Sequence, residues 1–304
     1  MKVVLLTPGQ GAQSVLMGQD FYENFTIFRQ TFEEAEDYTR LSIRKWIYEG
    51  SSEELSQTDR SQLAIYVTTM GISRVLEEIC PEVEIGAAIG LSLGEYSVLT
   101  IAGALNFKDG VELVRKRGEL MQEASIRNPG KMAAVLGLTQ EQIEPHLVGS
   151  AVLANLNTPL QSVISGKSED IEVTSENLKK NGAKRVIPLD VRGAFHSSLM
   201  ESAYLEFKSI VDATPFQIPR FPIVMNATAT FESNPEKIRV LLSKQLVSSV
   251  KFRQSAELVG KDLPFLELGP GTIVKGLIQK NIDATVLSIN TLKDLKEFKV
   301  CACL

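Results

Sequence analysis

The sequence predicts an α/β protein with a hydrolase-like large subdomain, built around a mainly parallel sheet, and an inserted ferredoxin-like small subdomain. Two observations carry this prediction. Short apolar segments at residues 2–7 and 85–90 are bounded by turn-forming residues and alternate with amphipathic helical patterns, as in a parallel sheet covered by helices. Between residues 131 and 190 the order changes to strand, helix, strand, strand, helix, strand, which is typical of ferredoxin-like folds.

The change of rhythm also predicts where the two parts meet. We expect residues 1–127 and 191–304 to form the large subdomain and residues 128–190 to form the small one. A chain of 304 residues is long enough for one large domain that carries such an insertion. Within the insertion, strands are expected at about 132–138, 151–155, 162–165 and 185–189, and helices at 139–147 and 168–181.

In the large part, the first strand ends at Pro8-Gly9-Gln10-Gly11, and helical patterns continue from there to about residue 80. One helix is expected directly after Ser92 and another over residues 109–125. A further helix is expected from His196 to about Asp212, because apolar residues recur there at helical spacing. The remainder of the chain alternates strands and helices.

Composition and charge exclude several classes of protein. The net charge is −5 and Lys and Arg are spread along the chain, which argues against a nucleic-acid partner. No apolar run approaches the roughly 20 residues that cross a bilayer, so no membrane partner is expected. Three cysteines are too few and too irregular for a disulfide framework, which predicts a reducing, cytoplasmic location.

The candidate nucleophile is Ser92. Gly90-Leu91-Ser92-Leu93-Gly94 matches the pattern G-x-S-x-G between a predicted strand and a predicted helix. Such a sharp turn pushes the serine hydroxyl outward, the glycines relieve crowding, and the helix N-terminus favours developing negative charge. A tight turn without chemistry is the alternative interpretation of the pattern.

The chain has only two histidines, which makes the search for a general base short. His146 lies at the end of a short predicted helix, where a surface or capping role is the better interpretation. His196 lies at the start of a predicted helix, whose dipole disfavours the imidazolium form and keeps a neutral base available. A purely structural histidine remains the alternative.

Arg117 is predicted to lie on a buried helix face. It stands three or four residues from Leu113, Val114, Leu120 and Met121, so it shares their core-facing stripe. A buried arginine needs an anion or hydrogen-bond acceptors. A clamp for a substrate carboxylate and a structural ion pair are both compatible with this position.

Several further motifs occur in a consistent order. They are Pro8-Gly9-Gln10-Gly11-Ala12-Gln13, Gln62-Leu63-Ala64, Gly90-Leu91-Ser92-Leu93-Gly94-Glu95-Tyr96, Arg117-Gly118-Glu119-Leu120-Met121, Asn155-Leu156-Asn157-Thr158-Pro159, Ile164-Ser165-Gly166, Phe195-His196-Ser197 and Glu267-Leu268-Gly269-Pro270-Gly271. Together they resemble, over nearly the whole chain, the malonyl-CoA:acyl carrier protein transacylases of fatty acid and polyketide synthesis.

The resemblance implies transfer of a malonyl group through an ester on Ser92, with His196 as the base. It implies that the backbone N–H groups of Gln10 and Leu93 form the oxyanion hole. The family orients its histidine with a backbone carbonyl rather than an aspartate, and the matching position in this chain is expected to be Lys251.

The resemblance also implies how the acyl group is bound. Arg117 would hold the malonyl carboxylate and Gln62 would line the acyl pocket. Leu91 stands where the family most often has histidine, which removes one polar wall of that pocket. Phe195, an aromatic residue before the histidine, accompanies malonyl in polyketide relatives. Asn157 is expected to line the cleft between the subdomains.

The implied substrates are malonyl-CoA and the phosphopantetheine thiol of an acyl carrier protein, with no metal and no permanently bound cofactor. A monomer is expected. Carrier proteins are typically acidic and this chain is also net negative, so a local basic patch is required near the active site. Departures from the family pattern at Ala12, Leu63 and Arg192 leave the acyl preference and the choice of partner open.

Three alternatives are weighed against this interpretation. An esterase of the α/β-hydrolase type places its histidine near the C-terminus, but no histidine follows His196. An acyl or thioester hydrolase on the same scaffold tends to lack the arginine that stands here as Arg117. A silent docking module would be expected to lose Ser92 or His196. The sequence does not separate fatty acid synthesis from polyketide synthesis.

Overall fold

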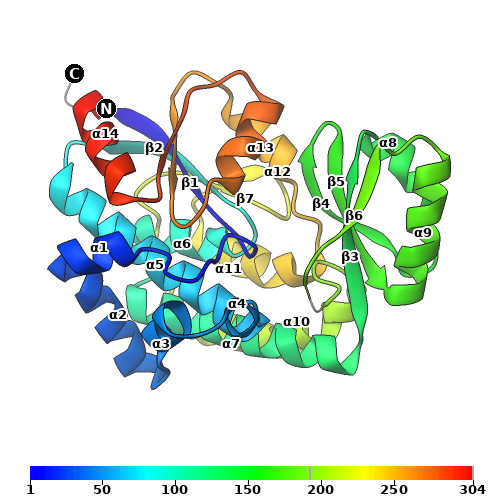
Figure 1. The fold of residues 1–304 in the computed structure, drawn as a ribbon, viewed down its shortest axis with the longest axis horizontal. Coiled ribbons are helices and arrows are strands. Elements are labelled where there is room, and N and C mark those ends of the chain that lie inside the picture. Colours follow the sequence, from blue (N-terminus) through cyan, green and yellow to red (C-terminus); the bar gives the residue numbers. More distant parts are fainter. Residues whose placement is uncertain (192, 303–304) are drawn as a thin grey trace.

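The computed structural model describes residues 1–191 and 193–302, although the side chains of the last two of these are not described (Figure 1). Arg192 therefore lies outside the described residues. Two sheets organise the chain: one of six strands in the order β10-β9-β1-β2-β7-β8, and one of four strands in the order β4-β5-β3-β6. Over the described residues, no helix combines the length and apolarity that crossing a membrane requires.

The large sheet is mainly parallel, as predicted. Its strands are β1 (Lys2–Thr7), β2 (Glu84–Gly90), β7 (Ile223–Met225), β8 (Thr230–Glu232), β9 (Phe265–Leu268) and β10 (Val286–Ile289). Every neighbouring pair is parallel except β7 with β8 at one edge. The carboxyl ends of β1 and β2 lie side by side, because Thr7 pairs with Gly90. The loops that follow these two strands therefore meet.

Helices cover both faces of this sheet. They are α1 (Gln19–Asn24), α2 (Thr26–Thr39), α3 (Ile43–Tyr48), α4 (Ser52–Leu55), α5 (Thr58–Ile79), α6 (Gly94–Ile101), α7 (Phe107–Arg127), α10 (Glu201–Ala213), α11 (Pro235–Lys244), α12 (Phe252–Val259), α13 (Ile273–Asn281) and α14 (Leu292–Ala302). Along β1, Val3 and Leu5 join one apolar cluster, while Val4 and Leu6 join a second with α12 and α13. This alternation explains why β1 is apolar throughout: both of its faces are buried.

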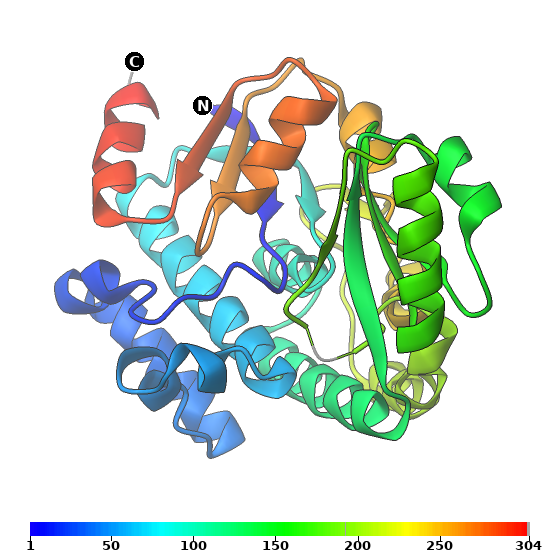
Figure 2. The same cartoon turned by 45° about the vertical axis from the view of Figure 1, so that its right-hand side comes forward.

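The small sheet has the predicted ferredoxin-like order. It contains β3 (Gly130–Leu136), β4 (Val152–Thr158), β5 (Gln161–Lys167) and β6 (Arg185–Pro188), all paired antiparallel, with α8 (Gln140–Ile143) and α9 (Ser168–Lys180) between them. It has its own apolar core, and α9 covers its outer side (Figure 2). The division of the chain at residues 127/128 and 190/191 stays a prediction.

Two differences from the predicted helices have local causes. The first helix of the insertion is only one turn long. It begins at a capping box formed by Thr139 and Gln142 and continues as the 3-10 turn η1 (Glu144–His146). The helix expected from His196 begins later: the 3-10 turn η2 (Ser198–Met200) precedes α10. His196 has a φ of 56°, a left-handed conformation that a right-handed helix cannot include.

Hydrogen bonds also join the small sheet to the large part of the molecule. The N–H of Leu156 on β4 donates to the carbonyl of Val250 at 2.9 Å, and the N–H of Val250 donates to Ala154 at 2.8 Å. The side chain of Asn281 on α13 donates to the carbonyl of Asn157 at 2.8 Å. These contacts hold one edge of the small sheet against the large part.

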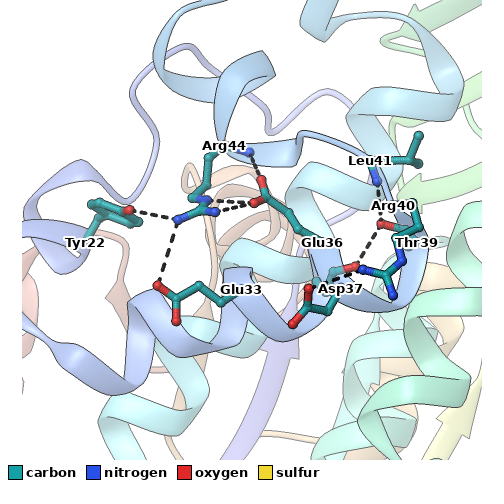
Figure 3. Close-up of polar contacts among 9 residues, drawn as sticks. Tyr22, Glu33, Glu36, Asp37, Thr39, Arg40, Leu41 and Arg44 are labelled. Carbon is teal, nitrogen blue, oxygen red and sulfur yellow. Dashed lines mark hydrogen bonds and ion pairs between the residues drawn. The ribbon is translucent and has the colours of Figure 1, made fainter.

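A polar cluster closes the turn between α2 and α3 (Figure 3). Both the backbone N–H and Nε of Arg44 donate to the carboxylate of Glu36 at 2.8 Å, and Nη1 donates to the hydroxyl of Tyr22 at 3.3 Å. Arg40, with a φ of 59°, reverses the chain between the two helices. This cluster fixes a corner of the large part by hydrogen bonds, and it contains none of the predicted site residues.

Candidate active site

Ser92 occupies a strained turn between β2 and α6. Its φ of 50° lies in the left-handed region that residues with a side chain rarely adopt. The glycines on either side are required by close approach: a Cβ on Gly90 would lie 2.1 Å from the backbone of Gly94, and a Cβ on Gly94 would lie 2.4 Å from the carbonyl of Thr7. The turn therefore presents the serine as the G-x-S-x-G pattern predicts.

The hydroxyl of Ser92 lies 2.8 Å from Nε2 of His196, although the two residues are 104 positions apart. The other ring nitrogen of His196, Nδ1, lies 2.8 Å from the carbonyl oxygen of Gln245. A carbonyl can only accept, so Nδ1 carries the proton and Nε2 is left to accept from Ser92. The pair has the geometry of a nucleophile and its general base.

His196 is buried, and burial lowers its pKa to about 4, with the positive charge of Arg117 acting in the same direction. Both effects favour the neutral imidazole. The sequence predicts a neutral base for a different reason, the dipole of a helix beginning at His196. In the structure, that helix starts five residues later, so burial and Arg117 take its place.

The prediction that the carbonyl of Lys251 orients His196 is wrong. The orienting carbonyl belongs to Gln245, in the 3-10 turn η3 (Gln245–Val247). Lys251 stands at the start of α12, and its carbonyl already accepts from the N–H of Ser255 at 3.0 Å. A helix uses the carbonyl of its capping residue for its first hydrogen bond, which leaves that oxygen unavailable to the histidine.

Two backbone N–H groups lie unused beside the turn of Ser92. A Cβ on Gly9 would lie 2.5 Å from the carbonyl of Leu91, so the loop after β1 runs directly against this turn. Within the described part of the chain, no hydrogen bond engages the N–H of Gln10 or of Leu93. Free N–H donors next to a nucleophile are what an oxyanion hole requires. Gln10 and Leu93 are the residues predicted for that role.

Arg117 is 1% exposed, on the buried face of α7. Its Nη1 donates to Oε1 of Gln62 at 2.5 Å, and its Nη2 donates to Oε1 of Gln245 at 2.9 Å and to Oγ of Ser92 at 3.0 Å. Among the described residues, no carboxylate lies within ion-pair distance of it, and its Nε is buried without a partner.

A buried guanidinium stays charged and is costly to bury without an anion. The neutral amides of Gln62 and Gln245 satisfy some of its hydrogen bonds but do not neutralise it. Tyr96 adds its ring face, with the ring centroid 5.4 Å from Cζ of Arg117. The site is therefore prepared to receive a negative group within reach of Ser92, and the structural ion pair weighed as an alternative is not observed among the described residues.

The other predicted pocket residues differ in how closely they join this centre. Gln62 belongs to the centre, since its Oε1 accepts a hydrogen bond from Arg117. Leu91 is half-buried beside Gly9, and Phe195 is 5% exposed directly before His196. Asn157 is 8% exposed where the small sheet meets α13, with its Oδ1 buried and unpartnered, and no hydrogen bond between described residues joins it to Ser92. His146 lies in η1 of the small subdomain, away from the centre.

Three further residues, which no sequence pattern marks as catalytic or substrate-binding, complete the centre. Oδ1 of Asn226, which follows β7, accepts from the N–H of Ser92, and its Nδ2 donates to the carbonyl of Gly90, both at 2.7 Å. Glu95 is fully buried, and its carboxylate accepts from the N–H of Asn226 and from Nε2 of Gln245. A charged residue in a helix whose eight residues are all buried is a signal for Glu95. Asn226 and Gln245 have no comparable signal.

A strained serine after a parallel strand, a neutral buried histidine and a charged buried arginine together have the geometry expected of a serine acyl-transfer enzyme with a site for an anionic group. The chain belongs to the acyl transferase domain family, whose model matches residues 4–298. It is 40% identical over 292 residues to the malonyl CoA-acyl carrier protein transacylase of Bacillus subtilis, covering 92% of this chain and 90% of that protein. The transacylase of the same name from Staphylococcus aureus is 37% identical over 304 residues, with 97% of each covered.

Solved structures agree with these relatives. The acyl-carrier-protein-S-malonyltransferase of Bartonella henselae superposes with a TM-score of 0.95 at 31% identity, over all of both chains. A malonyl-transacylase solved in complex with its type II PKS acyl-carrier protein superposes with a TM-score of 0.92 at 32% identity, over 97% of this chain and 98% of that one.

Proposed function

We propose that the protein transfers a malonyl group from malonyl-CoA to the phosphopantetheine thiol of an acyl carrier protein, through an ester on Ser92. The observation that carries this proposal is Arg117, a buried cation with no carboxylate partner among the described residues, whose Nη2 lies 3.0 Å from Oγ of Ser92. A malonyl group brings both of the things this site lacks: a carboxylate for the guanidinium and a thioester carbonyl for the serine.

In the first half-reaction, Nε2 of His196 takes the proton of Ser92 as Oγ attacks the thioester carbonyl. The N–H groups of Gln10 and Leu93 hold the oxyanion, and each such donor typically lowers the barrier by about 3 kcal/mol. The C–S bond then breaks, and His196 returns the proton to the leaving coenzyme A sulfur. The product is a malonyl ester on Ser92, with its carboxylate on Arg117.

In the second half-reaction, His196 takes a proton from the carrier protein's thiol, whose sulfur attacks the ester carbonyl. The same N–H donors hold the second oxyanion, and Ser92 leaves with the proton from His196. The two thiols use one site in turn, so the kinetics are ping-pong. No step needs a metal or redox cofactor.

The aromatic ring of Phe195 beside His196 supports a preference for malonyl over bulkier branched acyl groups. One methyl group in a pocket is worth only about 1–3 kcal/mol, so this preference is one of degree. The same site is compatible with a role in fatty acid synthesis and with a role in polyketide synthesis. A monomeric state, a cytoplasmic location and a basic docking patch for the carrier protein stay predictions from the sequence.

Intact-protein mass spectrometry tests the proposal. The protein is incubated with malonyl-CoA or acetyl-CoA in the absence of carrier protein, beside the variants Ser92→Ala and Arg117→Ala. We expect a malonyl adduct that Ser92→Ala abolishes and that Arg117→Ala weakens more for malonyl than for acetyl. Arg115→Ala is the matched control, since Arg115 lies on the same helix but pairs with Glu112 and Glu119.

Two results would contradict the proposal. Steady release of free malonate with no adduct on the protein would favour a hydrolase on the same scaffold. An adduct that forms with acetyl-CoA but not with malonyl-CoA would remove the role of Arg117 and, with it, the substrate.

A further inference from the structure

Glu95 is a buried acid that the proposed reaction does not use. It lies on α6, three residues after Ser92, and is 0% exposed. Its two carboxylate oxygens accept from different parts of the chain: Oε1 from the backbone N–H of Asn226, and Oε2 from Nε2 of the Gln245 side chain. Among the described residues, it pairs with no cation directly.

The side chain of Gln245 lies between this acid and Arg117. Its Nε2 donates to Glu95 and, at 2.9 Å, to the carbonyl of Ser92. Its Oε1 accepts from Nη2 of Arg117 at 2.9 Å. An amide can be placed either way round, so its neighbours decide which end carries the oxygen. An ionised carboxylate and a backbone carbonyl only accept, so Glu95 and the carbonyl of Ser92 together turn the NH2 end of Gln245 toward themselves and its oxygen toward Arg117.

We propose that Glu95 is a positioning residue: it is the remote counter-charge of Arg117 and, through Gln245, it keeps the guanidinium oriented but unoccupied for the malonyl carboxylate. This inference rests on the proposed role of Arg117. A carboxylate in direct contact would form a two-bond pair with the guanidinium and occupy the donors that the substrate needs. A guanidinium with no counter-charge nearby would be costly to bury.

The same residue links the clamp to the base. Gln245 holds Nδ1 of His196 through its backbone carbonyl and Arg117 through its side chain. Because Glu95 fixes that side chain, it restrains both groups that must converge on Ser92. The backbone N–H of Asn226 donates to the other oxygen of Glu95, and the side chain of Asn226 accepts from the N–H of Ser92.

Protonation of Glu95 would reverse the arrangement. A protonated carboxyl donates one hydrogen bond, and the N–H of Asn226 cannot accept it, so the oxygen of Gln245 would turn toward Glu95 and the hydrogen bond from Nε2 to the carbonyl of Ser92 would be lost. Its NH2 end would then face the donors of Arg117. Glu95→Gln reproduces this state, since a glutamine at this position accepts from Asn226 and donates to Gln245. Arg117 is the charged group that acts on Glu95, and the imidazole of His196 is neutral.

The experiment compares acylation of the full-length protein by malonyl-CoA and by acetyl-CoA at about pH 9, where Glu95 is ionised because burial raises its pKa only to about 8. The readout is the ratio of the two values of kcat/KM. We expect Glu95→Gln to lower the malonyl-to-acetyl ratio roughly tenfold or more, which is the effect of misplacing one charge-assisted hydrogen bond.

Glu267→Gln is the matched control. Glu267 is also 0% exposed and accepts two backbone N–H groups, from Val274 and Lys275, but it touches neither Arg117 nor Gln245. We expect this variant to keep the wild-type ratio. An unchanged ratio in Glu95→Gln, including an equal loss with both substrates, would overturn the inference and leave Glu95 a structural residue.

The double variant Glu95→Gln with Gln245→Glu tests the positioning role of Glu95 if the single variant does not fold. It keeps the same charge but places the carboxylate directly against Arg117, so we expect it to fold and to lose the preference for malonyl. Retention of that preference would overturn the inference. Arg117→Ala is measured in parallel: if it leaves the ratio unchanged, the proposed function itself fails, whatever Glu95→Gln does.

Discussion

Arg117 donates a hydrogen bond to Oγ of Ser92 at 3.0 Å. The guanidinium thus lies directly against the proposed nucleophile. Under the proposed mechanism, a carboxylate that binds Arg117 would compete with Oγ of Ser92 for this donor, whereas a neutral acyl group would not.

The first prediction concerns the shape of this cation. Arg117→Lys keeps the charge but replaces a planar fork of donors with a single ammonium, which cannot form two parallel hydrogen bonds to a carboxylate while it also holds Gln62 and Gln245. We expect kcat/KM for acylation by malonyl-CoA to fall by about ten- to a hundredfold, measured as the rate of adduct formation. Arg115→Lys on the same helix should leave that rate near the wild-type value, and a similar result for Arg117→Lys would contradict the two-bond clamp.

The second prediction concerns the acid limb of the pH profile. Burial and Arg117 lower the pKa of His196 to about 4, so the base stays neutral well below the ordinary histidine range. The rate at which a neutral sulfonyl fluoride modifies Ser92 should stay level from about pH 7 to 5, below the titration of Glu95, and fall only near 4. Such a reagent does not use the carboxylate site. A midpoint near the ordinary value of about 6.5 would show that His196 is far more solvated than the structure has it.

The third prediction concerns the loop that carries the N–H of Gln10. A Cβ at Gly9 would meet the carbonyl of Leu91 at 2.5 Å, a backbone atom that cannot move aside alone. Gly9→Ala should displace the loop and lower kcat about a hundredfold, the effect of losing one oxyanion donor. Gly276→Ala is the control: it meets nothing within 4 Å in α13, and it should leave activity intact and add about 0.5–1 kcal/mol of stability. Wild-type turnover in Gly9→Ala would exclude Gln10 from the oxyanion hole.

The fourth prediction links Glu95 to the dependence of stability on pH. Burial raises its pKa from 4.5 to about 8, so the folded state binds this proton more tightly than the unfolded state does. The sign follows: the contribution to stability is fully present below about pH 4.5 and is lost as the pH rises through about 8. Relative to Glu95→Gln, the wild type should lose stability across this window, by about 1.4 kcal/mol for each unit of pKa difference at most. Urea unfolding at about pH 5, 7 and 9 measures the difference, and parallel curves would contradict it.

The fifth prediction concerns Asn226 and compares its effect on stability with its effect on the rate of Ser92 acylation. Asn226→Ala leaves the N–H of Ser92 and the carbonyl of Gly90 without their partner, at about 1–3 kcal/mol for each buried group. We expect both the stability and the rate of Ser92 acylation to fall. The control is Asn234→Ala, which removes the cap of α11 and should cost about 1 kcal/mol without changing the rate. An unchanged rate in Asn226→Ala would show that the turn holds Ser92 without it.

Site residues that neighbouring residues in the sequence mark could be predicted, whereas site residues that are positioned by contacts between distant parts of the chain could not. Ser92 is marked by its flanking glycines, and Arg117 by its place on an apolar helical stripe. Asn226 and Gln245 meet Ser92 from 134 and 153 positions away, through backbone and amide contacts that leave no pattern in the sequence. The error at Lys251 has the same origin, because any backbone carbonyl can orient a histidine and its residue type carries no information.

The fold shows the same division. Alternating apolar segments predicted both sheets, because burial on one or two faces constrains side chains directly. The start of the helix after His196 was placed too early, since its apolar spacing reveals nothing of the left-handed backbone at His196. In that conformation the imidazole contacts both Ser92 and Gln245, which are distant in the sequence.

The backbone contacts between Val250 and β4 link the small sheet to the carbonyl that orients His196. Val250 lies five residues beyond Gln245, and the stretch between them is held at one end by His196 and at the other by the small sheet. The direction of the imidazole therefore depends on how β4 lies against the large part, so a substitution that displaces β4 would also displace Gln245 and turn His196 away from Ser92.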